Sequence, residues 1–75
     1  HLAEKGANLD HADNGGRTPT FIAAFQGHVD MVRYLAEKGA DFDQADNDGC
    51  TPTHISAQEG HLNVVRFLAE KGADL

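Results

Sequence analysis

Cys50 and His54 are the residues whose types could support nucleophilic chemistry, because a thiol becomes reactive when a nearby base removes its proton. They lie four positions apart, a spacing that places two residues on one face of a helix. Thr51 and Pro52, however, predict that a helix starts after Cys50, so the cysteine falls in the preceding turn. No third residue is placed to orient His54. We therefore interpret Cys50 as a partly exposed turn residue and predict no catalytic residues.

A metal site would need Cys50, His54 and His61, but the expected helix separates the first two from the third. The chain contains no CxxC and no HxxxH pair. The segment DNDG at 46–49 resembles part of a calcium loop, but it is too short and lacks the later Glu. We predict neither a metal nor a cofactor.

The net charge of the chain indicates which classes of partner it would attract. Six Lys and Arg residues against twelve Asp and Glu residues give a net charge of -6. Nucleic acids and anionic membrane surfaces attract clusters of basic residues, so we expect neither as a partner, and the acidity favours a basic protein. No apolar run approaches the roughly 18 residues of a membrane-spanning helix.

Cys50 is the only cysteine, so no disulfide can form within the chain, which is typical of a reducing compartment. We expect the cytoplasm or the nucleus. The sequence starts with His1 rather than Met, and Leu75 falls inside a repeated pattern. We therefore expect it to be a piece of a longer protein.

The turns and helices that would position Cys50, His54 and the other residues considered above recur every 33 residues. When residues 1–42 are aligned with 34–75, 27 of the 42 pairs are identical. The segment LAEKGA occurs three times, and His28 coincides with His61, which predicts a structural role in binding loop backbone. We divide the chain into the end of one repeat (1–12), a complete repeat (13–45) and a repeat without its final segment (46–75).

Each repeat predicts two helices. Asp, Asn and Gly favour a turn at its start, Thr18 or Thr51 then caps a helix that begins with proline, and glycine ends it. A second helix follows, with an apolar stripe at Val29, Val32, Leu35 and Ala36, or at Leu62, Val65, Leu68 and Ala69. Residues 40–45 read as an extended finger. The expected helices are 19–26, 29–38, 52–59 and 62–71.

The segments TPTFIAAFQGH, TPTHISAQEGH and LAEKGAD resemble the ankyrin repeat family, with its 33-residue period and T-P-L-H-x-A opening. The resemblance implies an all-α solenoid of stacked helix-turn-helix units joined by extended β-turn fingers. Thr20 and Thr53 replace the family's usual Leu, which could cost about 1–3 kcal/mol each in lost apolar volume. Phe21 replaces the usual His, and we expect it to enter the core and refill that space.

Members of this family are scaffolds that bind proteins, so the resemblance implies partner binding through finger tips and the exposed side of the first helices. Several differences between the two copies fall on these expected surfaces. The predicted contact residues are Arg17, Phe25, Gln26, Asp48, Cys50, Gln58 and Glu59. Phe25 either anchors a partner or packs on a neighbouring repeat. The alternative function is a structural spacer that positions another domain of a longer protein.

An array of so few repeats exposes apolar faces at both ends. We therefore expect either that the chain comes from a longer array or that copies of it stack end to end, the second giving a scattering mass above that of one chain. Light scattering on the 75-residue chain measures this, and a stable monomer would contradict it.

Overall fold

The computed structural model describes residues 9–72, which form four helices and no strands. The helices are α1 (Pro19–Gln26), α2 (Val29–Glu37), α3 (Pro52–Gln58) and α4 (Leu62–Glu70). Of the repeat expected before residue 13, positions 1–8 lie outside the described residues, as do 73–75 of the last repeat. None of the described helices is long and apolar enough to cross a membrane.

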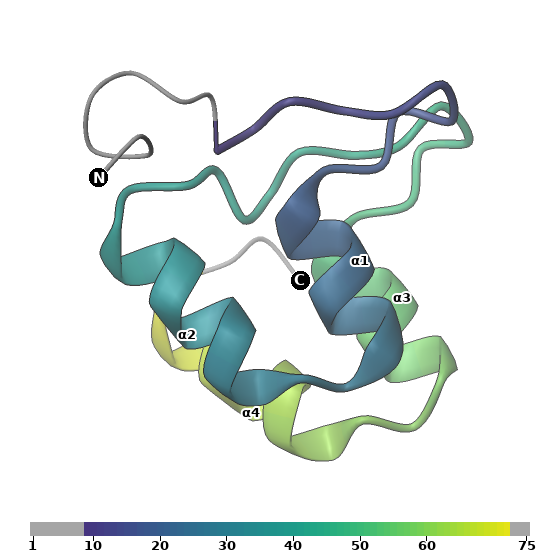
Figure 1. Cartoon of the computed structure of the whole chain (residues 1–75). Helices are drawn as coiled ribbons and strands as arrows, with labels where there is room; N and C mark the ends of the chain where they lie inside the picture. The colour runs from purple at the N-terminus through teal and green to yellow at the C-terminus, as the bar shows by residue number, and fades with distance from the viewer. Residues whose placement is uncertain (1–8, 73–75) are drawn as a thin grey trace.

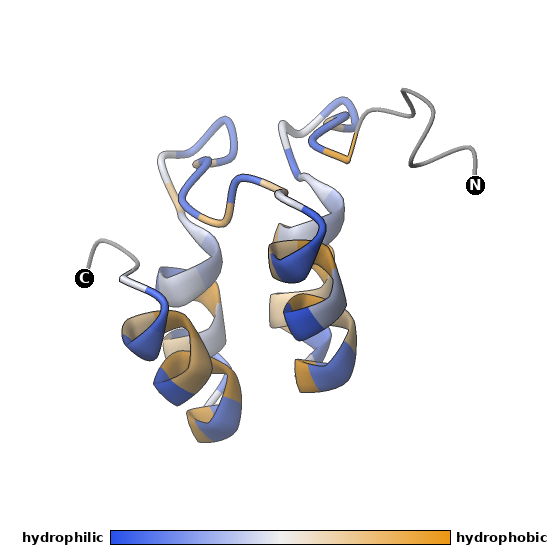
Figure 2. Cartoon of the chain, turned by 90° about the vertical axis from the view of Figure 1, so that its left-hand side faces the viewer, coloured by the Kyte–Doolittle hydropathy of each residue, from blue (hydrophilic) through white to orange (hydrophobic). Residues whose placement is uncertain are grey.

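The helices form two hairpins that stack side by side. Helix α1 packs on α2 and on α3, and α4 packs on α3 and α2, so each hairpin contacts the other through both of its helices. Figure 1 shows α1 beside α3 and α2 beside α4, with the connecting turns projecting together from one end of the helices. The view in Figure 2 separates the two hairpins and shows the same arrangement. The predicted all-α solenoid is confirmed.

The helix starts follow the predicted capping chemistry. The Thr18 hydroxyl accepts a hydrogen bond from the Phe21 amide, and the Thr51 hydroxyl accepts one from the His54 amide, both at 3.1 Å. Proline occupies the first turn in each case, where the missing amide proton costs nothing. Helix α1 ends where predicted, and the other three end one residue earlier than predicted, because Lys38, Glu59 and Lys71 serve as C-caps.

The main hydrophobic cluster is shared by the two hairpins. Its buried members come from all four helices and form a single cluster: Phe21, Ala23, Ala24, Val32, Ile55, Val64 and Leu68. Phe21 is only 5% exposed, as predicted for a core residue. Stacking therefore provides the burial that one hairpin lacks.

The predicted stripe of α4 is partly wrong. Leu62 is 65% exposed, whereas Val64, outside the predicted stripe, is fully buried. Val64 joins the core because α4 packs against the preceding hairpin, and its equivalent in α2, Met31, is 50% exposed. Met31 and Leu62 thus lie on the outer sides of α2 and α4. The corresponding side of the other second helix faces a neighbouring hairpin and packs against the core. End-to-end stacking of copies on the outer sides stays a prediction.

Residues 9–17 form the first finger and residues 41–50 form the second, each including the turn at the start of a repeat. The two fingers are joined to each other. In the first finger the Asp13 carboxylate accepts hydrogen bonds from the Gly15 and Arg17 amides. The Asn47 amide of the second finger donates to the Gly15 carbonyl at 2.9 Å, and its side chain donates to the Asn14 carbonyl at 3.0 Å. These bonds fix the spacing between consecutive fingers.

Thr20 and Thr53, at the family's usual Leu position, are both buried, and neither hydroxyl has a hydrogen-bond partner among the described residues. A buried hydroxyl without a partner loses its bonds to water and gains none in return. Each threonine thus carries an unsatisfied polar group in addition to its smaller apolar volume. The buried position of Phe21 is consistent with the expectation that it refills the space.

We predict that Thr20→Val raises the free energy of unfolding by about 1 kcal/mol, because valine keeps the shape and removes the unpaired hydroxyl. Thr18→Val is the matched control, since Thr18 is equally buried but its hydroxyl caps α1. It should lower the free energy of unfolding by about 1 kcal/mol. Urea unfolding followed by circular dichroism measures both changes. Destabilisation by both variants would show that the Thr20 hydroxyl has a partner.

Candidate functional site

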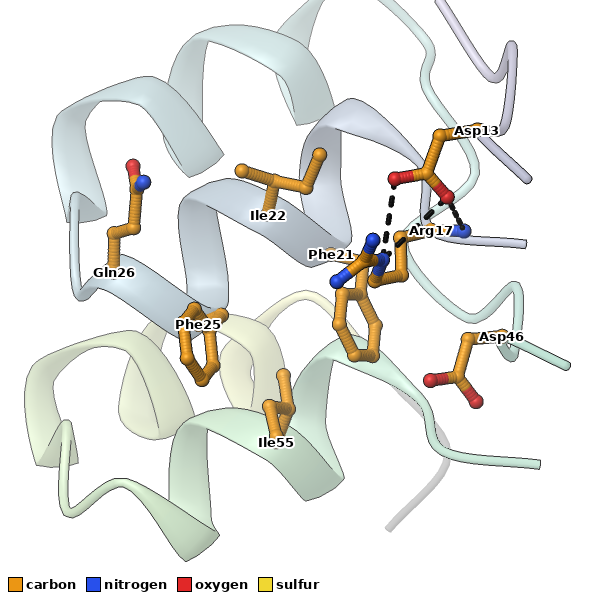
Figure 3. A pocket seen from close by; sticks show the side chains of 8 residues that line it. All are labelled: Asp13, Arg17, Phe21, Ile22, Phe25, Gln26, Asp46 and Ile55. Atoms are coloured by element: carbon orange, nitrogen blue, oxygen red, sulfur yellow. Dashed lines mark hydrogen bonds and ion pairs between the residues drawn. The ribbon is translucent and has the colours of Figure 1, made fainter. Parts of the chain in front are cut away.

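A groove lies where the first finger meets the exposed side of α1 and the adjoining side of α3. Its volume is about 390 Å³. Figure 3 shows the side chains that line it, which come from both fingers and both first helices: Asp13, Arg17, Phe21, Ile22, Phe25, Gln26, Asp46 and Ile55.

The floor and one wall of the groove are apolar. Phe21 and Ile55 are nearly buried, at 5% and 8% exposed, and they belong to the core cluster. Ile22 and Phe25 also line the groove, at 39% and 46% exposed, although Ile55, the equivalent of Ile22 in the next repeat, is buried. The three-residue spacing of Ile22 and Phe25 places both on one side of α1. A large exposed apolar side chain such as Phe25 beside nearly buried apolar residues marks a surface suited to binding.

The polar rim begins with an ion pair in the first finger. Arg17 Nε lies 3.1 Å from Asp13 Oδ2, with both side chains about half exposed. The hydrogen bond from the Arg17 amide lowers the pKa of Asp13 below its usual 3.8, with smaller contributions from the Gly15 amide and the guanidinium. A lowered carboxyl pKa stabilises the fold above the unfolded-state pKa, and this is lost as pH falls through the folded-state value. The ionised form of Asp13, present at neutral pH, therefore favours this turn.

Asp46 occupies the equivalent place in the second finger, and its Oδ1 accepts hydrogen bonds at 2.9 Å from the Asp48 and Cys50 amides. Cys50 stands where the first finger has Arg17. Within residues 9–72 no Lys or Arg pairs with Asp46. The groove is thus rimmed by one carboxylate that is paired with Arg17 and one that has no Lys or Arg partner among the described residues.

The Cys50 thiol is half-buried and packs against the core. Burial raises the pKa of this thiol, and the charges of Asp46 and Asp48 raise it further. The thiol therefore stays protonated at neutral pH, the opposite of what a nucleophile requires. Among the residues that the structure describes, no group of three or more His, Cys, Asp or Glu side chains is placed to hold a metal ion.

A family model of ankyrin repeats in three copies matches residues 1–75. The chain belongs to the ankyrin repeat family. No curated protein matches the sequence. Ankyrin repeats are generally protein–protein interaction modules, and the family is typically non-catalytic.

Three of the seven predicted contact residues meet in the groove of this ankyrin array: Arg17, Phe25 and Gln26. Asp48, Gln58 and Glu59 are exposed but lie outside its lining, and Cys50 is half-buried beside the second finger. Phe25, whose position the sequence left open, is on the surface.

Sequence comparison between the repeats missed the remaining lining residues, including Ile22, Ile55, Asp13 and Asp46. These four form two pairs that are identical in the two copies, so a search for variable positions passes over them. The available signal was the spacing of Ile22 and Phe25, because residues three apart on a helix share a face.

The following repeat holds the end of α1 in place. His61 Nε2 donates a hydrogen bond to the Phe25 carbonyl at 3.0 Å, so this nitrogen carries the proton. His61 thus bonds backbone, as predicted, but its acceptor is a helix carbonyl of the preceding repeat and not loop backbone, and among the described residues the His28 side chain makes no such bond. The His61 ring lies against Gly27, where an added Cβ would be 2.6 Å from Nδ1. The backbone of Phe25 thus depends on a residue 36 positions later.

We predict that Gly27→Ala destabilises the chain more than Gly60→Ala does. Gly27 has a φ of 76° and Gly60 a φ of 78°. In this left-handed conformation an added Cβ costs about 1–2 kcal/mol. Only at Gly27 must the His61 ring also move and lose its hydrogen bond, which adds about 1 kcal/mol.

Urea unfolding of both variants, alone and in a His61→Ala background, measures the difference. Without the His61 ring the costs at Gly27 and Gly60 should become equal. An unchanged difference in that background would show that the ring is not the cause.

Proposed function

We propose that this ankyrin array is a non-catalytic recognition module that binds a protein partner across its finger tips and the exposed sides of α1 and α3. The observation that carries the proposal is the groove with exposed Phe25, which consecutive repeats build together. The family's general role in protein–protein interaction supports it.

The surface is already ordered before a partner arrives. The two fingers are joined by hydrogen bonds from Asn47, and the Phe25 carbonyl is held by His61. Because these groups are fixed in the free chain, binding would lose little conformational entropy on ordering them. Such a surface suits recognition of a partner by a preformed shape.

We also propose that the partner is basic where it meets the fingers. In the finger segments 9–17 and 41–50, Arg17 is the only Lys or Arg, and the acidic residues are Asp10, Asp13, Asp41, Asp43, Asp46 and Asp48. The other Lys and Arg residues among those described lie on or directly after the second helices: Arg33, Lys38, Arg66 and Lys71. This separation of charge favours approach of a basic surface to the finger side.

The test uses a photo-crosslinking amino acid placed at Phe25 or Glu59, on the proposed surface, and at Tyr34 or Glu70, on exposed positions of the second helices. We expect one protein to be captured from the source cells at the first pair of positions and not at the second. Phe25→Ala combined with Glu59→Ala should then weaken its purified complex by about tenfold or more. Tyr34→Ala combined with Glu70→Ala is the control and should leave the affinity unchanged.

Two outcomes would contradict the proposal. Capture from the second-helix positions alone would place the interaction on the other side of the molecule. Absence of any captured protein at all four positions would favour the alternative, a structural spacer that positions another domain.

A further inference from the structure

We propose that the groove receives a large apolar side chain from a segment of the partner, and that Asp46 pairs with a Lys or Arg beside it in that segment. This rests on the proposed function, since it names the chemistry that the same surface would select. The occupant is thus a peptide that combines an apolar anchor with an adjacent cation.

The apolar part follows from burial. Phe25 leaves 46% of its surface in water and lines the groove together with the nearly buried Phe21 and Ile55. Figure 3 shows Phe25 and Ile55 in the space between α1 and α3. An apolar side chain inserted here would contact both helices and remove Phe25 from water. Burial of this kind is worth roughly 25 cal/mol per Å² before the entropic costs of association.

The cationic part follows from the difference between the two fingers. Asp13 faces Arg17 at 3.1 Å, so its charge is already compensated. Asp46 has no Lys or Arg partner among the described residues, and the exposed Asp48 adjoins it. Two backbone amides hold Oδ1 of Asp46, so the carboxylate is fixed in position and needs no ordering to accept a charged donor. A partner carboxylate at this end would be repelled.

Among the described residues, the apolar Phe25 and the carboxylate of Asp46 come together where the two repeats meet. The position of Phe25 in the next repeat is Gln58, which offers no aromatic surface. The exposed residue of similar size, Tyr34, lies on a second helix, where the Lys38 ammonium is 5.7 Å from its ring centroid. The groove therefore predicts one preferred register for a bound peptide.

The test pans a phage-displayed library of random 12-residue peptides on the 75-residue chain, and fluorescence anisotropy then measures the selected peptides. We expect a consensus with Phe, Leu, Ile, Met or Trp next to Lys or Arg. Phe25→Gln, which introduces the residue of the neighbouring repeat, should weaken binding by about tenfold or more. Tyr34→Gln is the matched control, because both aromatic residues are 46% exposed, and it should leave binding unchanged.

Asp46→Asn removes the charge but keeps an oxygen that accepts the hydrogen bonds from the two backbone amides. It should weaken binding about three- to tenfold at low salt, with the difference shrinking near 1 M salt because exposed charges are screened. Asp30→Asn on α2 removes the same charge away from the groove and should have no effect. Circular dichroism confirms that each variant keeps the helix content of the wild type.

The outcomes separate this inference from the proposed function. Peptides of another chemistry, for example acidic ones, whose binding is lost in Phe25→Gln would overturn the inference and leave the proposed function intact. Apolar–basic peptides whose binding is insensitive to Phe25→Gln and Asp46→Asn would also overturn it. If no peptide binds the wild-type chain better than Phe25→Gln, the inference fails, while crosslinking to a protein partner would still support the broader function.

Discussion

Stacking of the two hairpins builds the core cluster of this protein, and the rest of the structure depends on that stacking. Phe21 of one hairpin and Ile55 of the next belong to the same core cluster, together with Val32 and Val64. The groove lies directly above two of these residues. Its floor is therefore a part of the stacking interface that continues to the surface, so a change that loosens the stacking would alter the groove as well.

The helices were predictable because their signals are local. Thr18 and Thr51 cap helices that begin with proline, and the observed bounds differ from the predicted ones by at most one residue. The exposed Leu62 and the buried Val64 were not predictable in the same way. Helical periodicity identifies apolar positions within one helix, but which of them becomes buried depends on the neighbouring hairpin.

The candidate site shows a related limit. Comparing the two repeats identified Arg17, Phe25 and Gln26, because positions free of packing duties can differ between copies. It missed Ile22 and Ile55, which are identical in sequence but differ in environment: one is 39% exposed and the other 8%. Their difference arises from their place in the array. Only three-dimensional packing distinguishes a residue that another repeat covers from one that faces water.

The hydrogen bond from His61 to the Phe25 carbonyl runs from one repeat to the preceding one, as do the bonds from Asn47 to the first finger. This direction affects how such arrays can be recombined. A repeat carrying a new residue at the position of Phe25 keeps its backbone support only if the repeat after it supplies the histidine. His28 and His61 share that position, so these repeats are interchangeable in this respect. New recognition surfaces could therefore arise by exchange of whole repeats without rebuilding the contacts that hold them.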